Sequence, residues 1–176
     1  MLPIKIIPIN QNYLEFWHRI YNDPATRQHQ PIQPTTMAEQ EVMLNRFVDH
    51  DLANNTLPSY KWILIESESS QPIGFASFHR LQIEQGIGRI GYSISPEFWG
   101  KGYATQAVVQ LTSLIFRKTN MERLEAVCSI HNPASQRVLD KAGFKYEGVR
   151  RDYLRIRDER IDHHSYAILK SDWLAK

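Results

Sequence analysis

Apolar residues along the chain recur with two different periods, and these periods predict where helices and strands lie. In residues 12–21 and 102–118 they recur at helical spacing, and the second stretch has a clear apolar stripe of Ala104, Val108, Leu111 and Ile115. From residue 60 onwards, most other segments alternate polar and apolar residues, which is typical of strands with one buried face. The pattern therefore predicts helices combined with a sheet.

Local signals fix several ends of these elements. Thr36 and Glu39 form a capping box, which begins a helix that we expect to continue to about residue 51. Asn132 and Pro133 open another helix, and Gly143 closes it as the left-handed residue after the last turn. The predicted helices cover residues 12–21, 36–51, 102–118 and 133–142, and the predicted strands cover residues 3–9, 60–67, 72–81, 87–95, 123–130, 144–157 and 161–169.

The order β-α-α-β-β-β-α-β-α-β-β is typical of a mixed α/β (α+β) domain, and 176 residues predict one domain over residues 1–176. One cysteine, Cys128, excludes a disulfide scaffold, and we expect it to be buried as a small apolar side chain. No apolar run approaches the roughly 20 residues of a membrane helix, and we see no secretory signal. We therefore expect a cytoplasmic protein with no membrane partner.

Composition also argues against nucleic acid as a partner, because the net charge is only +2, from 21 basic and 19 acidic residues. Residues 86–91 fit the dinucleotide-binding pattern G-x-G-x-x-G, but they lead into a predicted strand and not into a helix. We interpret them as a glycine-rich turn, with nucleotide binding as an alternative. Residues 99–105 follow a strand and open a helix, so their backbone N–H groups could bind a phosphate or simply form a tight turn.

Two longer segments occur together, in residues 90–105 (IGYSISPEFWGKGYAT) and 130–144 (IHNPASQRVLDKAGF). At this spacing and in this order they resemble the GNAT superfamily of acyl-CoA N-acetyltransferases, and within it the ribosomal-protein N-terminal acetyltransferase group of the RimJ/RimL type. Residues 22–24, 72–75 and 162–163 fit the same resemblance. It implies a single GNAT-fold domain with a mostly antiparallel mixed sheet flanked by helices, and acetyl-CoA as co-substrate.

The resemblance also implies where the co-substrate binds. The N–H groups of residues 99–104 would hold the CoA pyrophosphate, the strand end at residues 94–96 would pair with the pantetheine arm, and an N–H near Ile94 would face the thioester oxygen. Trp99 stands where many relatives have Gln or Arg, and we expect its role to be mainly that of its backbone. The implied cofactor-binding residues are Ile94, Ser95, Pro96, Trp99, Gly100, Lys101, Gly102, Tyr103, Ala104, Thr105, Asn132 and Ser135.

The predicted helix over residues 133–142 carries two cations, Arg137 and Lys141, which either reach the 3′-phosphate of CoA or form a solvated face. In the catalytic role, the resemblance implies that Ser135 donates to the departing CoA thiolate. The position of the carboxylate that some relatives use as general base corresponds best to Leu154, which is apolar. The candidates for the general base are therefore Glu97, Asp152, His163 or a bound water. The histidines show no metal-ligand spacing, so we expect no metal.

The expected reaction is acetyl transfer to a primary amine, on a small molecule or a protein N-terminus, by direct attack in a ternary complex. The alternative is a non-catalytic acyl-CoA-binding or sensing domain. The resemblance implies that the helices after the first strand form one wall of the acceptor groove. Residues 36–55 in that region are acidic and predict a cationic acceptor attracted to this wall, unless the acids only solvate a helix. The acids are Glu39, Glu41, Asp49 and Asp51. We expect a monomer or a homodimer.

Overall fold

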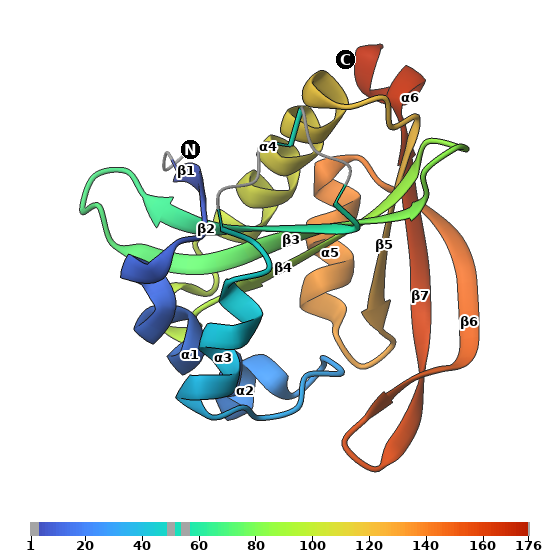
Figure 1. Cartoon of the computed structure of the whole chain (residues 1–176). Coiled ribbons are helices and arrows are strands. Elements are labelled where there is room, and N and C mark those ends of the chain that lie inside the picture. The colour runs from blue at the N-terminus through green and yellow to red at the C-terminus, as the bar shows by residue number, and fades with distance from the viewer. Residues whose placement is uncertain (1–3, 49–51, 54–56, 176) are drawn as a thin grey trace.

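The computed structural model describes residues 4–48, 52–53 and 57–175, and its centre is a seven-stranded sheet (Figure 1). In the order of the sheet, the strands are β1 (Ile4–Pro8), β2 (Ser59–Glu66), β3 (Pro72–Gln82), β4 (Ile87–Ile94), β5 (Arg123–Ser129), β7 (Glu159–Leu169) and β6 (Lys145–Ile156). Neighbouring strands are antiparallel except β4 and β5, which are parallel. The mostly antiparallel mixed sheet is therefore confirmed.

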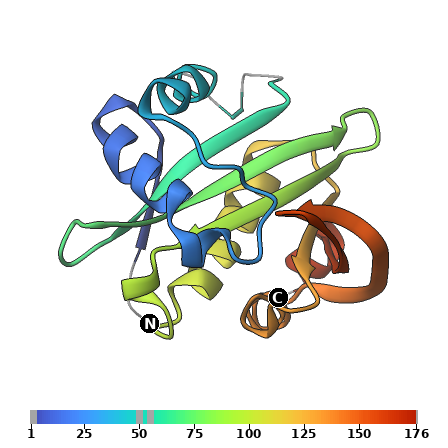
Figure 2. The ribbon, with the colours of Figure 1, turned by 90° about the horizontal axis from the view of Figure 1, so that it is seen from below.

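Helices cover both faces of this sheet (Figures 1 and 2). The first face carries α1 (Leu14–Asn22), α2 (Pro24–Arg27) and α3 (Met37–Leu44), and the opposite face carries α4 (Tyr103–Lys118) and α5 (Pro133–Ala142). The remaining elements are short: the 3₁₀ turns η1 (Gln11–Tyr13) and η2 (Pro96–Phe98), and the C-terminal helix α6 (Lys170–Leu174). We call the two sides of the sheet the α1–α3 face and the α4–α5 face.

Two apolar clusters hold these layers together, and strand alternation decides which residue joins which cluster. On β2, Trp62 and Leu64 belong to the larger cluster, which includes residues of α4 and α5. Between them, Ile63 and Ile65 point the other way and join the cluster that contains Trp17 of α1 and residues of α3. β2 is thus buried on both faces, which explains its nearly continuous apolar run.

Two local predictions differ from the structure. The helix that begins at the capping box ends at Leu44 and not near residue 51, because the next N–H groups bond three residues back, from Arg46 to Met43 and from Phe47 to Leu44. Residues 49–51 lie outside the described part. The short helix α2 was not predicted; Asp23 caps it by accepting the Thr26 N–H at 2.8 Å. Asp23 therefore both ends α1 and caps the start of α2.

The glycines of residues 86–91 are explained by the sheet. Gly86 lies in a turn with φ +65°, and the following residues enter β4 without any helix. A Cβ on Gly88 would lie 2.3 Å from the Phe78 ring, so close packing between strands requires glycine there. The dinucleotide alternative is wrong because its strand-to-helix context is missing.

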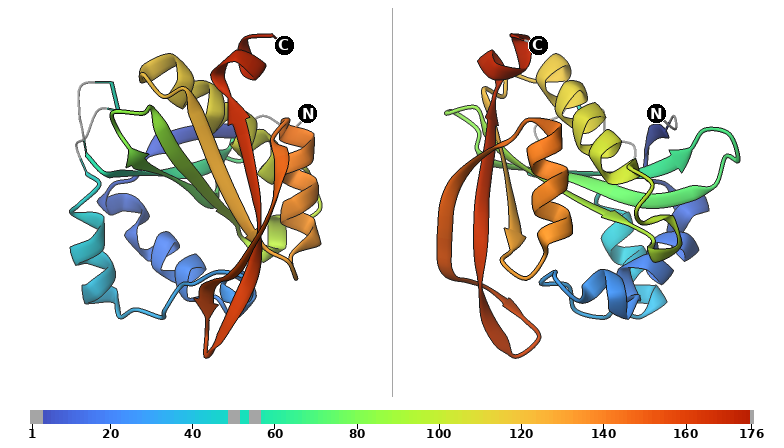
Figure 3. Two further views of the ribbon diagram at one scale, coloured as in Figure 1. Left: turned by 90° about the vertical axis from the view of Figure 1, so that its right-hand side faces the viewer. Right: turned by 180° about the vertical axis from the view of Figure 1, so that it is seen from behind.

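One feature of the sheet prepares the functional site. β4 and β5 are paired at only three positions, Ile87 with Arg123, Gly88 with Leu124 and Arg89 with Glu125. Beyond them the two strands diverge, as Figure 1 and the right-hand view of Figure 3 show. The sheet is therefore open in its middle, between residues 90–94 of β4 and residues 126–129 of β5.

Candidate active site

A cavity of about 990 Å³ lies where β4 and β5 part. Its wall comes from both strands, from the segment between η2 and α4, from α5, and from α2 with the residues after it. β3 adds Ser77, His79 and Leu81, and single residues of β6 and β7, Leu154 and His163, complete the wall. The cavity thus touches elements that lie on both faces of the sheet.

Strand alternation divides this cavity into two sides. On β4, the Tyr92 hydroxyl lies 2.8 Å from Oγ of Ser135 in α5, so Tyr92 points to the α4–α5 face. Its neighbour Ser93 points to the opposite face, where its Oγ accepts a hydrogen bond of 2.7 Å from Nε2 of Gln30. A ligand in the gap can therefore contact groups from both faces at once.

The α4–α5 side begins with a glycine loop. Gly100 and Gly102 have φ values of +76° and +84°, and a Cβ on either would meet no atom within 4 Å. Gly102 is the N-cap of α4 and offers no side chain, so the first N–H groups of this 16-residue helix receive no side-chain cap. Uncapped N–H groups and the positive end of the helix dipole form a suitable site for an anion.

The end of β4 presents backbone groups to the gap. Ser95 N–H donates to the Ile73 carbonyl at 2.8 Å, and Ile94 is opposite Gly74 in β3. In an antiparallel pair this alternation turns the N–H and C=O of Ile94 away from β3, toward the gap. Trp99 Nε1 donates to the Ile94 carbonyl at 2.6 Å, so the Trp99 side chain has a structural role that sequence analysis did not predict.

Most of the implied cofactor residues meet at this side. The cavity wall includes Ile94, Trp99, Gly100, Gly102, Tyr103, Ala104, Thr105, Asn132 and Ser135, together with Arg137 and Lys141. Three others, Ser95, Pro96 and Lys101, are not among the lining residues. Asn132 is the N-cap of α5, where its Oδ1 accepts the Ser135 N–H at 3.0 Å. The cap leaves the Asn132 amide group as a donor for a ligand.

Tyr92 and Ser135 form a hydroxyl pair beside Cys128. Burial raises the pKa of Tyr92 above its usual range, so its hydroxyl stays protonated and can donate a hydrogen bond. Burial also raises the pKa of Cys128 to about 11, and its thiol is buried as predicted. Sequence analysis missed Tyr92 because it lies between Ile90 and Ile94 on an apolar strand face. The signal that could have indicated a role for Tyr92 is its hydroxyl, because a buried tyrosine needs a polar partner.

The α1–α3 side contains one of the predicted bases. His163 is buried, and its Nδ1 lies 2.8 Å from the Ile161 carbonyl. A carbonyl can only accept, so Nδ1 carries the proton and Nε2 is left with a lone pair. Burial lowers the pKa of His163, which keeps the ring neutral at pH 7. Leu154, the position that corresponds to a carboxylate in some relatives, also lines the cavity.

The other two predicted bases lie elsewhere. Glu97 is exposed on η2, and it is not a lining residue. Asp152 is also exposed; its N–H donates to Asp162 at 2.8 Å and its carbonyl accepts from Arg160 at 2.9 Å. The geometry therefore brings Ser135 and His163 to the cavity and gives no support to Glu97 or Asp152 as catalytic groups.

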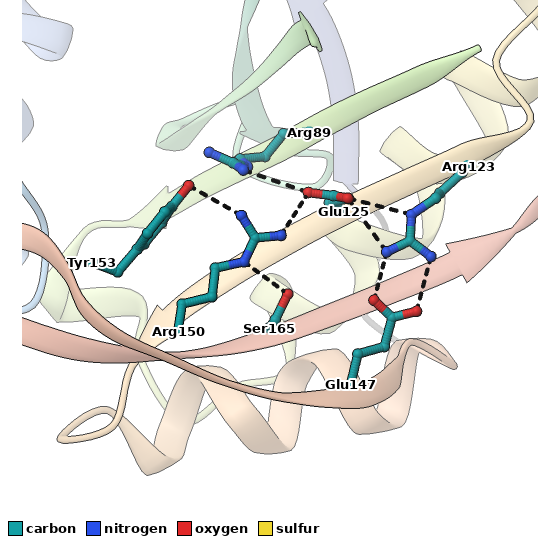
Figure 4. Close-up of polar contacts among 7 residues, drawn as sticks. All are labelled: Arg89, Arg123, Glu125, Glu147, Arg150, Tyr153 and Ser165. Carbon is teal, nitrogen blue, oxygen red and sulfur yellow. Dashed lines mark hydrogen bonds and ion pairs between the residues drawn. The ribbon is translucent and has the colours of Figure 1, made fainter. Parts of the chain in front are cut away.

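An arginine–glutamate network lies on the same side (Figure 4). The Glu125 carboxylate pairs with Arg89 at 3.4 Å, Arg150 at 3.0 Å and Arg123 at 3.3 Å. Arg123 also forms a bidentate pair with Glu147, at 2.8 Å for the Nη1 contact. We name these five residues the arginine cluster. Of its members, only Arg89 lines the cavity, and no sequence motif singles it out.

The acidic segment does not form a wall of this cavity in the described structure. Glu39 is held in the capping box, and Glu41 accepts a hydrogen bond of 2.9 Å from Gln11. Neither is a lining residue, and Asp49 and Asp51 lie outside the described residues. The wall on this side instead comes from α2 and the residues after it, including His29 and Gln30. Of the described acids, Glu39 therefore caps its own helix, and Glu41 links α3 to η1.

The described residues contain no group of three or more His, Cys, Asp or Glu side chains placed to hold a metal ion. No helix among them is long and apolar enough to cross a bilayer.

A family model and curated relatives match most of the chain. The family model for the acetyltransferase (GNAT) domain matches residues 4–145. The uncharacterized N-acetyltransferase p20 of Bacillus licheniformis is 29% identical over 154 residues, which is 87% of this chain and 85% of the relative. The [ribosomal protein uS5]-alanine N-acetyltransferase of Escherichia coli (strain K12) is 26% identical over 167 residues, 93% of this chain and 79% of the relative.

Solved structures share the fold. The crystal structure of spermidine N-acetyltransferase from Vibrio cholerae, in complex with CoA and spermine, superimposes with a TM-score of 0.86. The match covers 97% of this chain and 98% of the other, at 18% sequence identity. At that identity the likeness concerns the arrangement of helices and strands and not the choice of substrate.

Proposed function

Because this chain belongs to the GNAT acetyltransferase family and is an acetyl-CoA-dependent N-acetyltransferase, we propose that acetyl transfer to the amine takes place in the gap between β4 and β5. The observation that carries this proposal is the meeting of three donors at the gap: the Ile94 N–H and the hydroxyls of Tyr92 and Ser135. Acetyl-CoA supplies the activated acyl carbon, and the residues below bind it, orient it and move protons.

The α4–α5 side fits a long anionic ligand. The open positions at Gly100 and Gly102, together with the uncapped N-terminus of α4, hold the pyrophosphate. The gap-facing edge of β4 holds the pantetheine arm, and the amide of Asn132 donates to it. Arg137 and Lys141 on α5 line the same cavity and suit the 3′-phosphate.

The reaction needs a donor where negative charge develops. The Ile94 N–H faces the thioester oxygen, a role in which one preorganised donor contributes about 3 kcal/mol to the transition state. The Tyr92–Ser135 pair donates to the departing sulfur. Because burial raises the pKa of Tyr92, that hydroxyl stays protonated at neutral pH and can donate through Ser135.

The attacking amine must lose its proton, and His163 is the group that accepts it. It lines the cavity on the α1–α3 side, and its Nε2 lone pair is kept available by the Nδ1 contact with Ile161. A neutral imidazole at neutral pH is suited to general base catalysis. Acid and base therefore lie on opposite faces of the sheet, which separates the co-substrate from the acceptor.

The acceptor is a primary amine of a small molecule or a protein N-terminus. The named relatives include examples of both kinds of acceptor, since one acts on an alanine of ribosomal protein uS5 and another on spermidine. We further propose a single domain over residues 1–176 that works in the cytoplasm, as a monomer or a homodimer. Its single cysteine, buried in the core, suits a reducing compartment.

The test is the release of CoA thiol from acetyl-CoA with a panel of amines. Tyr92→Phe and Ser135→Ala should each lower kcat by about 10- to 100-fold with little change in the KM for acetyl-CoA, since one hydrogen bond to a charged group contributes about 1.5–3 kcal/mol. The matched control is Tyr166→Phe, which removes a hydroxyl from the buried core of the same face but not from the cavity wall.

The outcomes separate the alternatives. If the two hydroxyls act as one unit, the double variant Tyr92→Phe/Ser135→Ala loses less than the product of the single losses. Losses that appear only in KM would make the pair a binding element. Binding of acetyl-CoA without turnover of any amine would favour a sensing domain.

A further inference from the structure

The α1–α3 side of the cavity offers one cation that is only partly neutralised. Arg89 makes a single pair at 3.4 Å with Glu125, and Glu125 is already shared with Arg123 and Arg150. In Figure 4, the second terminal nitrogen of Arg89 points away from Glu125 and has no drawn partner. Within the described chain, its Nε is buried and has no hydrogen-bond partner. The donors that Arg89 keeps to spare beside the cavity are therefore those of its second terminal nitrogen.

The charges of the arginine cluster do not balance. Three guanidinium groups face two carboxylates, so one positive charge remains uncompensated. Tyr153 holds two of these groups in place, because Arg89 and Arg150 lie over its ring at 5.8 and 5.1 Å from the centroid. Arg150 also donates to the Tyr153 hydroxyl at 3.2 Å. The surplus charge is therefore fixed at the wall of the cavity.

We propose that the acceptor is a primary amine that carries a carboxylate, and that Arg89 binds this carboxylate and sets the specificity. This inference rests on the proposed function, which places the acceptor on the α1–α3 side. A guanidinium with free donors suits a carboxylate better than any other common anion-binding side chain does. The described wall of the cavity contains no Asp or Glu, so nothing in it attracts a polycationic amine.

The strand sets the distance between the two ends of such an acceptor. Arg89 precedes Ile94 by five positions on β4, which corresponds to about 16 Å between their Cα atoms. The arginine side chain spans part of this distance, and one extended residue spans about 3.5 Å. The space left fits an amine and a carboxylate separated by about one or two residues. A dipeptide has this length, and so does a peptide N-terminus with an acidic side chain next to it.

Matched acceptors test the idea and separate these two sources. One pair is a dipeptide and its C-terminal amide; the other is a pair of peptide amides with Glu or Gln at the second position. In each pair the carboxylate member should have a KM at least tenfold lower. Spermidine serves as the polycationic comparison, and thermal shifts of the CoA-bound protein report acceptor binding without turnover.

Variants of the arginine cluster identify the residue. Arg89→Gln should remove the preference for the carboxylate, so that the two members of each pair have similar KM values, and Arg89→Lys should keep part of it. The control is the double variant Arg123→Gln/Glu147→Gln, which removes one charge of each sign from the arginine cluster at residues that do not line the cavity, so that the surplus positive charge is kept. It should leave the preference intact. Melting temperatures confirm that all variants are folded.

The results distinguish failure of the carboxylate inference from failure of the proposed function. Equal use of acid and amide, a preference for spermidine, or a preference that survives in Arg89→Gln would overturn the carboxylate inference while leaving acetyl transfer in place. If no amine releases thiol, the proposed function fails. In that case, an Arg89-dependent thermal shift with the carboxylate peptides would still support the binding site, and no shift would overturn it.

Discussion

The glycine loop before α4 allows a test in which strain and binding are separated. Gly102→Ala adds one Cβ at a φ of +84°, in a direction where it meets no protein atom within 4 Å. A residue with a side chain pays about 1–2 kcal/mol for this left-handed conformation. For a domain of this size, that lowers the melting temperature by about 2–8 °C. The variant remains folded, since domains are stable by about 5–15 kcal/mol.

The effect on binding has a different origin. The new methyl group stands in the space where the pyrophosphate would approach the N–H groups of α4. Losing one charge-assisted hydrogen bond costs about 1.5–3 kcal/mol. We therefore expect the Kd for acetyl-CoA, measured by titration calorimetry, to rise by about 10- to 100-fold.

Gly148 provides the matched control. It has a φ of +120° on β6, a Cβ there would also meet no atom within 4 Å, and it does not line the cavity. Gly148→Ala should therefore lose at least as much stability as Gly102→Ala but keep the affinity of the parent. If Gly102→Ala binds acetyl-CoA as tightly as Gly148→Ala does, the loop is not the phosphate site, and the assignment of the whole α4–α5 side falls with it.

Two further predictions concern His163 and the capping box. Because burial lowers the pKa of His163, kcat of the parent should decline only below the ordinary histidine value of 6.5, and His163→Gln should lose this acid limb together with about 100-fold or more in kcat. The same shift means that the folded state binds fewer protons than the unfolded state, so stability falls as the pH drops below 6.5, and thermal unfolding of His163→Gln should show a flatter dependence. Thr36→Ala removes the capping box of α3 and should cost about 1 kcal/mol of stability. Its KM for the acceptor should equal that of the parent, because Thr36 does not line the cavity; a raised KM would return the acidic segment to the acceptor site.

Much of this fold is predictable because its signals are local. Asn132, Pro133 and Gly143 mark both ends of α5 within the sequence itself, and α5 runs from Pro133 to Ala142. The C-terminal end of α3 was missed because apolar spacing continues to Phe47, whereas the chain tightens into turns after Leu44. Periodicity alone does not show where a helix gives way to turns that bury the same residues.

The site was only partly predictable for a different reason. Alternation along β4 shows that Arg89 and Ser93 share a face, but not that this face lines a cavity. That depends on the point at which β5 leaves β4, and on Glu125, which lies 36 positions away from Arg89 in the sequence. The Tyr92–Ser135 pair spans 43 positions. Such contacts are set by tertiary packing, so sequence spacing could indicate the α4–α5 side but not the residues opposite it.

The open middle of the sheet also bears on how this protein avoids self-association. Strand edges with free N–H and C=O groups are templates for pairing with other chains, and proteins usually protect them. Here two such edges, residues 90–94 and 126–129, lie inside the sheet, between strands that are each fully paired on their other side. Helices on both faces restrict access to them (Figure 2). A ligand that pairs with β4 therefore does more than serve as a reactant: while bound, it covers an unpaired strand edge, and amide hydrogen exchange in β4 becomes a direct measure of its occupancy.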